Sequence, residues 1–121
     1  NVIKEFDHFS ERLDNFIFLS NVFVVAPGGI GTLLELFYTW QLMQVHQICH
    51  VPIILLGKEW PSLIKWLKKY PLENKYFTEK ELNLLYVAKN NKEAIEIINN
   101  AHLHFKSGKG KFCTNYKKYK I

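Results

Sequence analysis

The chain has 121 residues, a length that fits a single domain, and its hydrophobic fraction of 48% is sufficient for a buried core. The net charge of +5 arises at one end. Residues 106–121 hold six Lys and no acid, whereas residues 1–105 hold ten Lys or Arg and eleven Asp or Glu. This distribution excludes a basic face on the folded part and indicates a mobile basic tail after a domain at 1–105.

The cellular location is predicted from what the sequence lacks. No apolar run approaches the roughly 20 residues that span a bilayer, and no signal peptide is recognisable. Cys49 and Cys113 have neither metal-ligand nor redox spacing, so we expect unpaired thiols in a reducing compartment. These features predict a soluble, cytoplasmic protein that does not contact a membrane.

The first half of the chain predicts a helix, a strand and a second helix. Apolar residues repeat at a helical period over 3–20, and the Val-rich run at 22–26 is typical of a strand buried on both faces. A helix follows from about residue 29 to about residue 45. We expect its inward face to be marked by Ile30, Leu33, Leu34, Phe37 and Gln41 and flanked by Trp40.

The second half continues the alternation of strands and helices. The predicted elements are a strand at 52–56, a helix that begins near Pro61 and ends at Pro71, a short helix at 79–83 capped by Thr78, a strand at 84–88, and a helix that starts at Asn90 or Asn91.

The whole order predicts an α/β fold with a parallel sheet covered by helices on both faces. A sheet of three strands would leave apolar edges, and the chain opens on a helix. We therefore expect that part of the domain lies upstream of Asn1, or that a partner supplies more sheet.

The run from Pro27 to Glu35 is the most informative segment. Glycines between a strand and a helix let backbone N–H groups approach a ligand, and the helix N-terminus adds partial positive charge. Such a turn favours a phosphate or carboxylate ligand. It lacks the third glycine of the dinucleotide fingerprint and the Gly-Lys-Ser/Thr of a P-loop. The alternative interpretation is that the glycines only allow a tight connection between strand and helix and that the turn binds no ligand.

Two charged residues near this turn are candidates for catalysis. Glu35 either stabilises a cationic transition state or, through Thr32-x-x-Glu35, forms a capping box. Arg12 is the one Arg beside fifteen Lys, which favours a position that needs a planar guanidinium to clamp phosphate or orient Glu35. The alternative for Arg12 is an ordinary surface cation.

Other candidate sites are weaker. His46 and His50 fall in a predicted loop without an acidic neighbour, so no metal site is expected. Aromatic residues lie among the lysines of the tail, a pattern that could touch nucleic acid. A solvated terminus is the favoured interpretation, and nucleic acid is not an expected partner.

These residues resemble a known family. Pro-Gly-Gly-x-Gly-Thr-x-x-Glu, here Pro27 to Glu35, is the signature of the LONELY GUY (LOG) phosphoribohydrolases, formerly called possible lysine decarboxylases. The family has an Arg eight residues before a Ser-Asp pair, and Arg12 stands eight residues before Ser20-Asn21. The resemblance covers roughly residues 5–100.

The resemblance implies a Rossmann-like domain that forms a homodimer or a higher homo-oligomer. Its members hydrolyse nucleoside 5′-monophosphates to a free base, in some cases a cytokinin, and ribose 5-phosphate. They use no metal and no organic cofactor. By position, the 5′-phosphate would be bound by Gly28, Gly29, Gly31 and Thr32, and the catalytic pair would be Arg12 and Glu35.

The sequence also departs from the family pattern. Leu13 replaces the usual Lys after the Arg, and Asn21 replaces the Asp after the Ser. The family's early glycine-rich loop, which completes the nucleotide pocket, has no counterpart here. These departures keep an alternative open, in which the chain is a non-catalytic nucleotide sensor or carrier.

Overall fold

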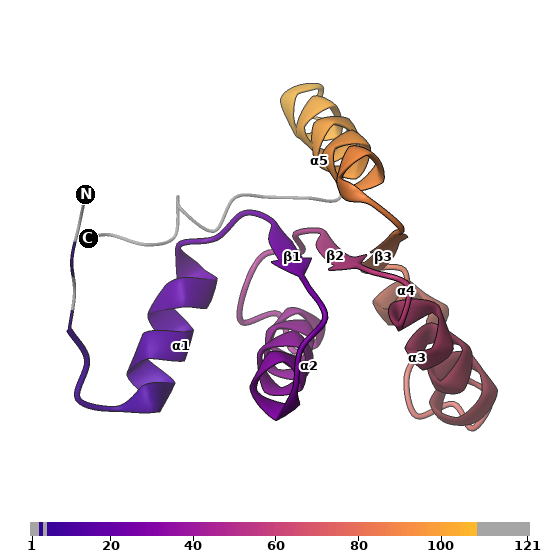
Figure 1. Cartoon of the computed structure of the whole chain (residues 1–121), viewed down its shortest axis with the longest axis horizontal. Coiled ribbons are helices and arrows are strands. Elements are labelled where there is room, and N and C mark those ends of the chain that lie inside the picture. Colours follow the sequence, from indigo (N-terminus) through magenta and orange to yellow (C-terminus); the bar gives the residue numbers. More distant parts are fainter. Residues whose placement is uncertain (1–2, 4, 109–121) are drawn as a thin grey trace.

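Helices and strands alternate along residues 3 and 5–108, the part of the chain that the computed structural model describes (Figure 1). The elements are α1 (Phe9–Phe18), β1 (Phe23–Val25), α2 (Ile30–Gln44), β2 (Ile53–Leu56), α3 (Trp60–Leu67), the π-helical turn η1 (Lys68–Leu72), α4 (Glu79–Leu82), β3 (Leu85–Ala88) and α5 (Asn91–Lys106). The predicted α/β class is confirmed.

The three strands form one parallel sheet in the order β1-β2-β3. Phe23 of β1 lies opposite Ile53 of β2, which in turn lies opposite Leu85 of β3. Strands covered on both faces consist of apolar residues without alternation, and Ile54 and Leu55 of β2 are indeed fully buried. Within the described residues, the outer edge of β1 pairs with no strand.

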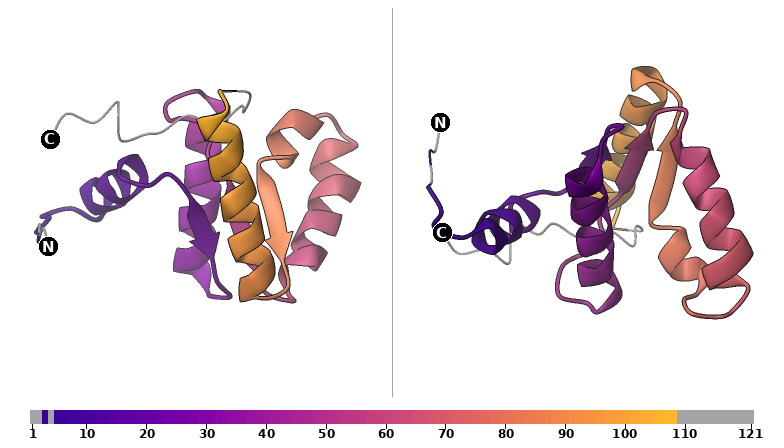
Figure 2. Two further views of the ribbon diagram at one scale, coloured as in Figure 1. Left: turned by 90° about the horizontal axis from the view of Figure 1, so that it is seen from above. Right: turned by 60° about the horizontal axis from the view of Figure 1, so that its bottom comes forward.

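Helices cover both faces of this sheet (Figures 1 and 2). Among the described elements, α5 is the helix that covers one face, where Ala94 packs with Ile54 and Ala88 in a small core. On the opposite face, α2 and α3 close the main core together with residues of α1. The resulting order of layers is that of a Rossmann-like fragment.

The first helix is shorter than its sequence pattern predicts. It begins at Phe9 and not near residue 3. Residues 5–8 are outside the helix. Its buried residues are Leu13 and Ile17, whereas Phe9 and Phe16 are each more than half exposed. Phe18 is partly buried against the same core.

The inward face predicted for α2 is wrong except for the flanking Trp40, which is buried. The buried residues are Leu36, Thr39, Trp40 and Met43. The residues expected inside are exposed, with Ile30 at 88% and Leu34 at 46%. Because α2 carries apolar residues on nearly all sides, the helical period alone does not reveal which side meets the sheet.

The predicted end of the third helix at Pro71 is also wrong. The chain continues past Pro71 in the π-helical turn η1, where the carbonyl of Pro71 accepts a hydrogen bond from the N–H of Tyr76 at 2.9 Å. Proline lacks a donor but keeps its acceptor, so a wider turn accommodates it.

The two predicted caps nearer the C-terminus are confirmed. Thr78 and Glu81 form a capping box at the start of α4, and the side chain of Asn90 accepts a hydrogen bond from the N–H of Glu93 at the start of α5. Lys106 ends α5, while residues 109–121 of the predicted tail lie outside the described residues.

Two observations bear on the expected environment. Cys49 is buried and takes part in a disulfide bond, so the expectation of unpaired thiols is wrong; Cys113 lies outside the described residues. No helix among the described residues has the length and apolarity that crossing a bilayer requires.

Candidate active site

The glycine turn joins the carboxyl end of β1 to the first residue of α2. Gly29 is the N-cap of this helix, in an extended conformation, and no side chain caps the helix end. The first backbone N–H groups of α2 therefore have no partner within the helix. The positive end of the helix dipole lies at the same place.

The capping-box interpretation of Thr32 and Glu35 is wrong. Because Gly29 is the N-cap, Thr32 is the third residue of α2 and Glu35 lies in its second turn. Glu35 is too far along the helix to reach back to the cap. The Glu35 side chain therefore does not cap this helix.

The three glycines of the turn differ in what surrounds them. A Cβ at Gly28 would lie 2.1 Å from the hydroxyl oxygen of Thr32, so packing requires glycine there. At Gly29 and Gly31 a Cβ would meet nothing within 4 Å, and neither residue has a positive φ. The fold does not require glycine at these two positions, and the open space in front of them suits close approach of a ligand.

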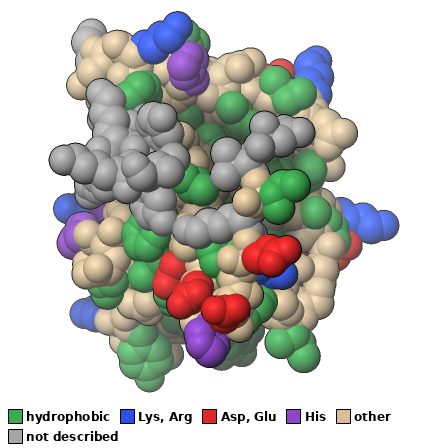
Figure 3. All heavy atoms as spheres, turned by 90° about the vertical axis from the view of Figure 1, so that its left-hand side faces the viewer, with side chains coloured by type: hydrophobic (Ala, Val, Ile, Leu, Met, Phe, Trp, Pro, Cys, Tyr) green, Lys and Arg blue, Asp and Glu red, His purple; other side chains and the backbone are tan. Residues whose placement is uncertain are grey.

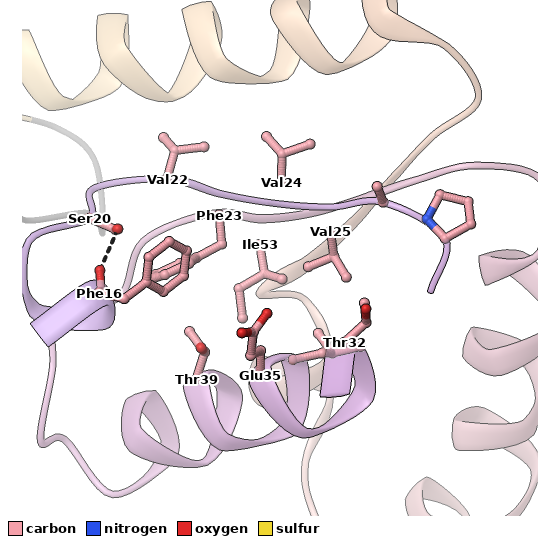
Figure 4. A pocket seen from close by; sticks show the side chains of 13 residues that line it. Phe16, Ser20, Val22, Phe23, Val24, Val25, Thr32, Glu35, Thr39 and Ile53 are labelled. Carbon is pink, nitrogen blue, oxygen red and sulfur yellow. Dashed lines mark hydrogen bonds between the residues drawn. The ribbon is translucent and has the colours of Figure 1, made fainter. Parts of the chain in front are cut away.

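A cavity of about 380 Å³ lies between β1 and α2. Thr32, Glu35 and Thr39 rise into it from α2, and Val25 and Ile53 close it from the sheet (Figure 4). At one end the cavity is lined by Phe16 of α1 and by Ser20, which follows that helix, and the Ser20 hydroxyl donates to the carbonyl of Phe16 at 2.6 Å. Among the described residues that line this cavity, Glu35 is the one with a charged side chain.

Thr39 is a cavity residue that sequence reasoning missed. It is 3% exposed and follows Glu35 by four residues, so the two side chains share one face of α2. The spacing from Glu35 is the one signal that could have identified it, once the orientation of the helix was known.

Arg12 and Glu35 line a second hollow of about 350 Å³ together with Phe9, Leu13 and Phe16. Glu35 thus borders both cavities, and the structure brings the two candidate catalytic residues to one place. The guanidinium carbon of Arg12 lies 5.4 Å from the centroid of the Phe9 ring, a cation–π contact. Figure 3 shows the left-hand side of the view in Figure 1, where acidic side chains gather near hydrophobic ones.

The turn also contacts the end of the next strand. Gly57, directly after β2, has a φ of +140°, and a Cβ there would lie 2.9 Å from the Cγ atom of Pro27. Close packing of this kind fixes the start of the turn against β2.

The two departures from the family pattern have different settings. Leu13 is 7% exposed in the main core, where an ammonium group would be costly to bury. Asn21 is exposed in the connection before β1. Neither adds a charge to the cavities.

The fold defines a Rossmann-like α/β protein with a glycine turn at the carboxyl end of an outer strand. Comparison with family models places it more narrowly: the model of a family described as "Possible lysine decarboxylase" matches residues 1–98. The chain belongs to this family, which is now known as LOG. None of the curated proteins compared with the chain matches it significantly.

Proposed function

We propose that this fold hydrolyses the N-glycosidic bond of a nucleoside 5′-monophosphate, releasing the base and ribose 5-phosphate. The observation that supports it most strongly is that Arg12 and Glu35 line one hollow, while Glu35 also lines the cavity that reaches Thr32 at the glycine turn. Family membership supports the same reaction class.

The 5′-phosphate would bind at the start of α2. Its oxygens would accept hydrogen bonds from the uncapped N–H groups after Gly29 and from the Thr32 hydroxyl, with the helix dipole favouring the negative charge. The missing side chains of Gly29 and Gly31 would leave the room that a phosphate needs. The ribose would then extend toward Glu35, one turn further along the helix.

The reaction would exchange two bonds at C1′ of the ribose. The C1′–N bond breaks, its electron pair and a proton go to the base, and a water oxygen bonds to C1′ as the water loses that proton. Positive charge develops on the ribose during this exchange, and the Glu35 carboxylate would stabilise it and orient the water. The guanidinium of Arg12 would hold either a phosphate oxygen or the Glu35 carboxylate in place.

The older description of the family, as possible lysine decarboxylases, receives less support. Pyridoxal-dependent decarboxylation needs a lysine placed to form a Schiff base. Neither cavity beside Glu35 is lined by a lysine among the described residues. Hydrolysis is the reaction that these side chains suit better.

The test is incubation of the protein with AMP and related monophosphates, with free base measured by chromatography. Glu35→Gln should lower turnover by at least about a hundredfold while nucleotide still binds, because the carboxylate would act in the transition state. Glu96→Gln on α5 is the matched control and should leave turnover unchanged. If Glu35→Gln changes only the melting temperature, the role of Glu35 is structural.

The same experiment separates the alternative of a nucleotide sensor or carrier. Leu13 favours that function, because it stands where the family usually has a Lys. Among the described residues, Arg12 is then the one cation that lines the two cavities. Calorimetric binding of nucleotide by the wild-type protein without any release of base would replace hydrolysis by this alternative.

We also propose that the chain assembles with a second copy of itself through the outer face of α2. The residues Ile30, Leu33, Leu34 and Phe37 repeat at the spacing of a buried helical stripe, yet all four are exposed. An apolar stripe of this regularity favours a protein interface.

A further inference from the structure

The position of Arg12 depends on how α1 rests against the remainder of the fold. Leu13 and Ile17, four residues apart, are the buried residues of this helix. Phe18 is partly buried against the same core, and the ring centroid of Phe16 lies 6.0 Å from that of Phe23. Apolar contacts of this kind are non-directional, so a directional hydrogen bond adds a constraint on how far α1 turns about its long axis. Figures 1 and 2 show α1 at one side of the molecule, next to α2.

A hydrogen bond crosses from α1 to α2 beside these apolar contacts. The hydroxyl of Tyr38 on α2 donates to Oδ1 of Asp14 on α1 at 2.7 Å. Successive residues of a helix are about 100° apart, so Arg12 and Asp14 flank Leu13 on opposite sides. One flank of α1 is therefore bonded to Tyr38, and the other presents Arg12 beside Glu35.

On α2, too, the residue that bonds to α1 lies close to a candidate catalytic residue. Tyr38 follows Glu35 by three residues, which places the two side chains on neighbouring positions of one helix face. That face is the one that meets α1, since Glu35 lines the hollow shared with Arg12 and Leu13. A bond to Tyr38 therefore fixes α1 relative to the helix that carries Glu35.

The chemistry of the pair suits a permanent contact. The hydrogen bond to the Asp14 carboxylate raises the pKa of the Tyr38 hydroxyl, so the donor keeps its proton at neutral pH. Hydrogen bonds with one ionised partner are stronger and shorter than neutral ones.

We propose that Tyr38 and Asp14 are positioning residues: their hydrogen bond fixes the roll of α1 and so holds Arg12 beside Glu35. The kinetic consequence rests on the proposed function, whereas the structural consequence does not. Neither residue lines the cavities described above, so both would act through Arg12.

The test compares Tyr38→Phe, which keeps the ring, with Tyr76→Phe as the matched control. Tyr76 is 77% exposed, so its hydroxyl faces solvent. Tyr38→Phe should speed hydrogen exchange of the α1 amides by about tenfold, the scale of one hydrogen bond to a charged group. It should also lower kcat/KM for nucleotide hydrolysis by about tenfold, while Tyr76→Phe changes neither quantity.

A rescue variant distinguishes positioning from general stability. Asp14→Asn retains an oxygen that accepts from Tyr38 and should preserve most of kcat/KM, whereas Asp14→Leu should match Tyr38→Phe. Combining Tyr38→Phe with Asp14→Leu should add little further loss, because both remove the same bond.

Two results would overturn the proposal. One is an exchange rate of α1 in Tyr38→Phe equal to that of the wild type. The other is a lower melting temperature with unchanged kcat/KM in an active enzyme. If the wild type releases no base from any nucleotide, the proposed function fails, and the exchange rates alone still decide whether Tyr38 holds α1.

Discussion

At the scale of single residues, the turn after β1 separates two reasons for glycine. Gly28 is required by packing, because a Cβ there would collide with Thr32. Gly29 and Gly31 are required by neither backbone conformation nor neighbours. The sequence does not distinguish the three glycines. In the structure, Gly29 and Gly31 leave open space that a ligand could occupy.

This difference predicts opposite outcomes for two alanine substitutions. Gly31→Ala should keep or raise stability, by up to about 1 kcal/mol, because alanine is the better helix residue. It should nevertheless weaken AMP binding at least about tenfold, since its Cβ would occupy the space of the phosphate. Binding can be measured by calorimetry in the Glu35→Gln background, where turnover does not interfere.

Gly28→Ala serves as the counterpart. Its Cβ must displace Thr32, so it should lower the free energy of unfolding by about 1–3 kcal/mol. Equal AMP affinity in Gly31→Ala and the unsubstituted background would show that the phosphate does not bind against this glycine.

At the scale of elements, the sequence predicts which segments form helices and strands better than it predicts which way they face. The strands are recognisable because Val, Ile and Leu runs such as 22–26 and 52–56 are short and end at Gly, Pro or Asn. The orientation of α2 is not recognisable, because its two apolar faces have similar composition. Only the sheet decides that Trp40 and Met43 lie inside.

The capping box of α4 predicts a pH-dependent contribution to stability. The carboxylate of Glu81 accepts from the backbone N–H of Thr78, and this bond, aided by the amide of Gln44, lowers the pKa of Glu81 despite partial burial. Its contribution is therefore complete above the unfolded-state pKa, about 4.3, and is lost as pH falls through the lower folded-state value.

Glu81→Gln should accordingly reduce stability at pH 7 by about 1 kcal/mol, the scale of one cap, and by less in acid below the unfolded-state pKa. Urea unfolding of both proteins at each pH measures the difference. Glu79→Gln in the same turn, which lacks the bond to Thr78, is the control. A loss that is equal at both pH values would contradict the assignment.

At the scale of the whole molecule, the candidate site draws on distant parts of the chain. Arg12 and Glu35 are predictable because the motif spacing identifies them individually. Their meeting at one hollow depends on how α1 packs, and so does the contact of Tyr38 with Asp14. Such roles come from tertiary contacts that no local pattern encodes.

The exposed stripe of α2 predicts the assembly of the molecule. Leu34→Glu should convert a dimer to a monomer, because it would bury a charge in the apolar interface. Light scattering after size-exclusion chromatography measures the mass. Leu103→Glu on α5, where the leucine is 62% exposed, should leave the dimer intact. A wild-type monomer, or a Leu34→Glu protein of unchanged mass, would contradict the proposed interface.

The contact between Gly57 and Pro27 gives the second strand an indirect influence on ligand affinity. Any larger residue at 57 must push against a rigid pyrrolidine ring and also adopt a backbone conformation unfavourable for L-amino acids. The displaced ring would tilt the amides that follow it, although residue 57 itself need touch no nucleotide. Searches for variants with altered substrate preference should therefore include this site, which a survey restricted to ligand-contacting residues would omit.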